Sequence, residues 1–70
     1  MHIDDALARK GWDSTDPDFT VVVSSLERAE QPHNIAQAVH YSVRALSHYI
    51  LGSNKLLKAF VKQMLHTSYR

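Results

Sequence analysis

Apolar residues recur at spacings of three and four along most of the chain, a pattern that predicts α-helices rather than strands. In the first half, four apolar residues keep this spacing: Phe19, Val22, Val23 and Leu26. Asp16 and Pro17 come just before them, and this pair is typical of an N-cap and a first helical position. We therefore expect a first core helix over residues 17–30.

A shorter helix is predicted close to the N-terminus, over residues 3–10, within a segment 1–16 that then becomes a linker. Asp4 and Asp5 suit the positive end of the helix dipole, and Gly11 is placed to end the helix in the left-handed conformation. An isolated helix of this length is marginal in water, so it must dock on the rest of the chain. Trp12 is expected to close one end of the core.

Residues 34–51 are interpreted as two short helices joined by a tight turn at residues 40–42. Asn34 can cap the first helix, with Gln37 as the other half of a capping box, and Ser42 stands where the second helix needs a cap. Gly52 can end the second helix, which leaves a C-terminal helix over residues 54–69. The expected fold is a single all-α domain, residues 1–70, of four to five short helices with a helix-turn-helix.

Charge is divided unevenly along the chain. Residues 1–30 hold seven acids and three Lys or Arg, whereas residues 31–70 hold five Lys or Arg and no acid. A 40-residue stretch without acids indicates a surface that meets something negative, with nucleic acid as the first candidate. The chain has no Cys and no apolar run of the roughly 18–20 residues that a membrane span needs, which favours a cytoplasmic location.

A helix-turn-helix places the start of its second helix against base edges in the major groove of DNA. On that interpretation the side chains predicted to contact bases are those of Val43, Arg44, Ser47 and His48. Those predicted to contact phosphates are Tyr41, Lys55, Lys58 and Lys62. A dimer or partner face is expected on the last helix, at Leu57, Phe60, Val61 and Met64. The predicted partners are double-stranded DNA and a second copy of the chain.

The central segment resembles the helix-turn-helix of the LuxR/GerE-type transcription regulators. The similarity is carried by Ile35-Ala36, Val39, Tyr41-Ser42-x-Arg44-Ala45-Leu46 and Tyr49-Ile50. A weaker resemblance runs to the AraC-type domain, through Ala36-Gln37, Ser42 and Leu46-Ser47-His48. These resemblances imply a small transcription regulator. The chain departs from the first pattern at His40, where that family often has Gly, and at Ala45 and Ser47, where Thr and Lys are common.

A second pattern runs through the same residues and supports a different architecture. Eight positions are spaced four and three apart without a break: Val39, Val43, Leu46, Ile50, Ser53, Leu57, Phe60 and Met64. This is a heptad repeat, and it predicts one long helix that packs on residues 17–29 as a hairpin and associates along the repeat. On this alternative Val43 is buried by association, whereas the helix-turn-helix leaves it exposed.

The alternative layout resembles a type III secretion needle subunit. Ser47-x-Tyr49, Leu56-Leu57-Lys58 and the ending Tyr69-Arg70 carry the similarity, although the Pro-x-x-Pro loop of that family is absent here. The resemblance implies a self-assembling helical protein. A small phage or plasmid factor that binds and inhibits a host protein is a further alternative, with a protein as its partner.

The sequence does not favour an enzyme, a metal site or a cofactor. The histidines of the second half, His33, His40, His48 and His66, lack the pairing with an acid at helical spacing that makes a metal site. Serines near His48 have no carboxylate in the acid-free half to complete a catalytic triad. We therefore expect no catalytic residues.

Overall fold

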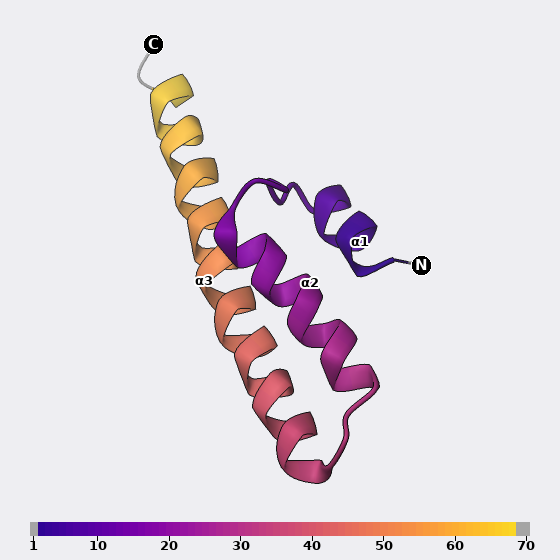
Figure 1. The fold of residues 1–70 in the computed structure, drawn as a ribbon. Coiled ribbons are helices and arrows are strands. Elements are labelled where there is room, and N and C mark those ends of the chain that lie inside the picture. Colours follow the sequence, from indigo (N-terminus) through magenta and orange to yellow (C-terminus); the bar gives the residue numbers. More distant parts are fainter. Residues whose placement is uncertain (1, 69–70) are drawn as a thin grey trace.

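One long C-terminal helix organises the molecule. In the computed structural model, which describes residues 2–68, three helices follow in the order α1 (Ile3–Arg9), α2 (Pro17–Glu30) and α3 (Ile35–Ser68). Figure 1 shows α2 folded back beside the first part of α3 and α1 lying against α2. The result is an elongated helical hairpin, with extents of 55 × 21 × 16 Å.

The all-α prediction is confirmed, but the prediction of four to five short helices is wrong. Residues 40–42, where a turn was expected, lie inside α3, and Gly52 continues the helix instead of ending it. The physical reason is that nothing between Asn34 and the end of α3 breaks a helix, since this stretch has no proline and Gly52 has no positive φ. The alternative prediction, a hairpin with one long C-terminal helix, is the architecture observed.

Local capping signals act where they were expected. The Asp16 side chain accepts a hydrogen bond of 2.8 Å from the amide of Asp18, which caps α2. The Asn34 side chain accepts one of 2.8 Å from the amide of Gln37 at the start of α3. The other half of the predicted capping box differs, because the Gln37 side chain accepts from the amide of His33, at 2.7 Å, and not from that of Asn34. Gly11 has a φ of 93°, the left-handed conformation predicted for it after α1.

The core is small and draws side chains from all three helices. Its buried apolar members are Leu7, Trp12, Phe19 and Val22, with Ile3, Val23, Leu26, Tyr49 and Leu56 partly buried around them. Trp12 closes the core as predicted, and its ring stacks on Tyr49 at 5.5 Å between centroids. Small buried residues, Ser25 on α2 and Ala45 on α3, allow the two helices to approach closely.

The last part of α3 runs on past the beginning of α2 (Figure 1). We call residues 57–68 the overhang; within it, every residue from 57 to 66 is exposed. The ending Tyr69-Arg70, which contributed to one of the resemblances, lies outside the described residues.

Candidate functional site

The heptad positions of α3 form a continuous exposed stripe, which we call the apolar seam. The seam consists of Val39, Val43, Leu46, Ile50, Ser53, Leu57, Phe60 and Met64. Apart from Ser53, each of these side chains is between 52% and 60% exposed. The seam does not face α2, because the α3 residues buried in the hairpin, Ala45 and Gly52, fall on another side of the helix.

An apolar groove runs between α2 and α3 and adjoins the seam. It is lined by Val22, Leu26, Ser42, Ala45, Leu46 and Tyr49 and has a volume of about 270 Å³. Leu46 belongs to both the groove and the seam, so the two apolar features form one connected surface. A connected apolar surface of this kind is typical of an interaction site.

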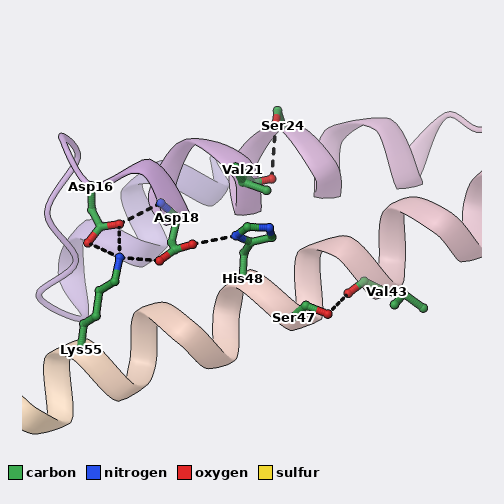
Figure 2. A network of polar contacts seen from close by, with 8 residues as sticks. All are labelled: Asp16, Asp18, Val21, Ser24, Val43, Ser47, His48 and Lys55. Atoms are coloured by element: carbon green, nitrogen blue, oxygen red, sulfur yellow. Dashed lines mark hydrogen bonds and ion pairs between the residues drawn. The ribbon is translucent and has the colours of Figure 1, made fainter.

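The opposite flank of α3 is polar and holds the hairpin in register. Figure 2 shows Asp18, near the start of α2, between two side chains of α3. One carboxylate oxygen of Asp18 lies 2.7 Å from Nδ1 of His48, and the other accepts a hydrogen bond of 2.5 Å from Nζ of Lys55. Lys55 also donates to Asp16 at 3.0 Å and 3.2 Å. These contacts join residues that are 30 or more positions apart in the chain.

The charges of this network shift its ionisation. Hydrogen bonds from Lys55 and then His48 lower the pKa of Asp18 below its ordinary value of 3.8. Hydrogen bonds to Asp18 and Asp16 raise the pKa of Lys55 above its ordinary 10.5. Asp18 therefore stays ionised at neutral pH although it is buried, and the α2–α3 contact contains a charged pair rather than neutral groups.

Two aromatic contacts fasten the other parts of the hairpin. Arg28 donates a hydrogen bond of 2.9 Å to the hydroxyl of Tyr41, and its guanidinium lies 5.4 Å from the centre of that ring. Lys10 donates to the hydroxyl of Tyr49 at 3.3 Å. The first contact holds the end of α2 to α3, and the second holds the segment after α1 to the middle of α3.

The residues predicted to contact bases separate in the structure. Val43, Arg44 and Ser47 are exposed, and the hydroxyl of Ser47 donates to the backbone carbonyl of Val43 at 2.9 Å. His48 is instead half-buried against Asp18. Val43 is exposed in the single chain together with the other apolar residues of the seam.

The residues predicted to contact phosphates also divide into two groups. Tyr41 is bound to Arg28, and Lys55 to Asp16 and Asp18. Lys58 and Lys62 are exposed on the overhang and form no ion pair with any residue from 2 to 68. The predicted dimer or partner face, Leu57, Phe60, Val61 and Met64, lies exposed on the same overhang. Of these four residues, Leu57, Phe60 and Met64 belong to the apolar seam, and Val61 lies beside it.

Sequence reasoning missed the part that Asp18 plays. Asp18 suits the positive end of the α2 dipole, but it is also buried and joins His48 and Lys55 across the hairpin. The signal that could have found it is the charge division of the chain. Because α3 contains no acid, a cation such as Lys55 can form an ion pair only with an acid of another segment, and Asp18 on α2 is such an acid.

Neither the site nor the whole chain was found to match a family model, a curated protein or a solved structure. None of the described helices is both long enough and apolar enough to span a membrane. Over residues 2–68 there is also no group of three His, Cys, Asp or Glu side chains that could hold a metal ion.

Proposed function

We propose that this protein is a self-assembling structural subunit, in which α3 associates with copies of itself along the apolar seam. The observation that carries the proposal is the exposed heptad repeat on one continuous helix. When two such helices associate, every third or fourth residue of each helix is buried against its neighbour. A second copy of the chain presents the matching repeat.

The imbalance of burial in a single copy supports this proposal. Five apolar residues are buried in the described chain, whereas eleven large apolar residues are exposed, all of them on α3. Burying one fully exposed Val, Leu or Ile side chain stabilises by about 1.5–3 kcal/mol, and about half of that gain remains for each seam residue, so covering the seam on two copies offsets the entropy lost on association. A chain of 70 residues without disulfides gains stability by sharing its core with a neighbour.

The kind of assembly that fits best is a needle-like filament, of the sort formed by type III secretion needle subunits. The observed hairpin consists of α2, a loop containing Pro32 and the long C-terminal helix α3, which is the layout that resembles that family. The elongated shape gives each copy two ends and a long apolar side, which suits stacking in a filament. The chain departs from that family in two ways, since it has no Pro-x-x-Pro loop and no acidic residue in α3. Here Asn34 and Gln37 order the connection between the helices instead.

A concentration series tests the proposal. We expect purified protein to form oligomers or fibres above a critical concentration, measured by analytical ultracentrifugation and negative-stain microscopy. The Ile50→Asp variant places a charge on the seam and should raise that concentration about tenfold or more, the equivalent of one lost buried side chain. Thr20→Asp is the matched control, because Thr20 is exposed on α2 and lies off the seam. Wild-type protein that stays monomeric at millimolar concentration would refute the proposal.

Duplex DNA binding is a second candidate function, favoured by the exposed cations of a helix that contains no acid. Arg44, Lys58 and Lys62 all lie on α3 and are exposed. A mobility-shift titration at low and high salt tests it, because phosphate contacts make affinity fall steeply with salt. Arg44→Ala should weaken a real complex while leaving the critical concentration for assembly unchanged. If no duplex is shifted at low salt, this candidate is excluded.

A further inference from the structure

The two ends of the hairpin carry opposite charge. At one end, which we call the tip, Glu27 and Glu30 are exposed on the last turns of α2 beside a surface hollow lined by Ser24, Glu27, Arg28, Glu30 and Gln31. At the other end, Lys58 and Lys62 lie beside a hollow of the overhang lined by Leu57, Lys58, Val61, Lys62 and Leu65. Figure 1 shows these ends on opposite sides of the molecule.

A single chain cannot bring these charges together. Lys62 lies about 40 Å along α3 from Ile35, the end nearest the tip, at about 1.5 Å per helical residue. That separation is several times the Debye length of about 8 Å at physiological salt, so the two ends do not attract each other within one copy. Neither Glu27 nor Glu30 forms an ion pair with another residue in the described part of the chain.

The spacing of the charges matches between the two ends. Glu27 and Glu30 are three residues apart on α2, and Lys58 and Lys62 are four residues apart on α3. Both spacings place side chains one helical turn apart on the same face, about 5–6 Å between β-carbons. Two helices laid side by side can therefore form both ion pairs at once. Arg28, the cation within the tip, already donates to Tyr41 of its own chain.

We infer that the overhang of one copy docks on the tip of the next, with Lys58 and Lys62 against Glu27 and Glu30. The occupant of the overhang is thus a second copy, bound head to tail. Such a contact uses different surfaces on its two sides, so it adds copies in one direction and extends a filament when the rotation between copies does not close a ring. This inference rests on the proposed self-assembly and adds its direction, with the seam supplying the lateral contacts.

Two charge-reversed proteins test the inference. One carries Lys58→Glu with Lys62→Glu, and the other carries Glu27→Lys with Glu30→Lys; all four positions are exposed, so the hairpin should fold, as helicity by circular dichroism will show. Each protein alone faces like charges at the contact, and its critical concentration should rise by about a hundredfold or more. Mixed in equal amounts, the two should assemble again, because each end then meets an opposite charge.

The outcomes separate this inference from the proposed function. Assembly of the mixture but not of either variant alone supports the head-to-tail contact. If the wild-type protein assembles and either variant alone assembles equally well, the head-to-tail contact is wrong and the seam proposal stands. The same conclusion follows if the wild-type protein assembles but the mixture of variants does not. Wild-type protein that never assembles overturns both. Raising the salt concentration should weaken wild-type assembly if the ion pairs form, and a critical concentration independent of salt would contradict them.

Discussion

Trp12 lies directly over Gly52, so closely that a β-carbon at Gly52 would stand 2.1 Å from Cη2 of the Trp12 ring. The glycine that was expected to end a helix is thus the site where the segment after α1 meets the middle of α3. A hydrogen atom at this position is what lets the indole stack on Tyr49 and join the core. The contact makes this glycine a structural requirement of the hairpin.

Gly52→Ala should destabilise the protein. Alanine favours a helix over glycine by about 1 kcal/mol, but displacing the indole ring costs about 1–3 kcal/mol in overpacking and also disturbs its stacking. We expect a net loss of unfolding free energy in urea denaturation followed by circular dichroism and tryptophan fluorescence. Asn54→Ala is the control, since Asn54 is exposed in the same helix and gains only the helical preference. Equal stability changes in the two variants would contradict the Trp12 contact.

Gly11→Ala tests a different property, the backbone conformation after α1. The β-carbon would have room, because the nearest atom outside neighbouring residues, Cδ2 of Leu56, is 4.0 Å away. The φ of 93° is nevertheless strained for an L-residue, by about 1–2 kcal/mol. Thermal unfolding should occur about 4–16 °C lower for a domain of this size. The unfolding temperature should fall less for Gly11→Asn than for Gly11→Ala, because Asn tolerates the left-handed conformation better. The reverse order would contradict a left-handed cap.

The stability of the hairpin should depend on pH through Asp18 and Lys55. The pKa of Asp18 is lowered on folding, so its contribution is present above 3.8 and is lost as pH falls below that value through the folded pKa. The pKa of Lys55 is raised, so its contribution is present below 10.5 and is lost as pH rises above that value. Unfolding free energies measured across this range should form a plateau with an acid and an alkaline limb.

Asp18→Asn is the variant that isolates this effect. It keeps the shape of the side chain but removes the charge, so it should be less stable at neutral pH and should flatten the acid limb. Asp4→Asn is the control, because Asp4 is exposed on α1 and forms no ion pair in residues 2–68. An acid limb that is as steep in the Asp18 variant as in the wild type would show that another carboxylate is responsible.

Hydrogen exchange should show one continuous helix across residues 40–42. Their amides lie inside α3, where it packs on α2, and should exchange slowly. Amides of the overhang lack that support and should exchange faster in the monomer, then become protected once copies assemble. Fast exchange confined to His40–Ser42 would indicate a turn at that place and contradict the structure.

The starts of the long helices were easier to predict from the sequence than the continuity of α3. Asp16, Pro17 and Asn34 act on their own neighbours, so the starts of α2 and α3 could be read from a few residues. The interior of α3 was harder, because Ser42 and Gly52 are weak breakers whose effect depends on surroundings. The heptad repeat correctly predicted one continuous helix, since its spacing of four and three residues continues past both Ser42 and Gly52.

The sequence by itself determined the helical class, the start of each long helix, the apolar seam and the division of charge between the two halves. All of these follow from local spacing and composition. Only the tertiary structure decided that Gly52 stays helical beneath Trp12, and that Asp18 is buried against His48 and Lys55. These contacts join residues 30 or more positions apart, and whether they form depends on the free energy of packing α2 on α3. That packing free energy cannot be predicted from the residue pattern of a single segment.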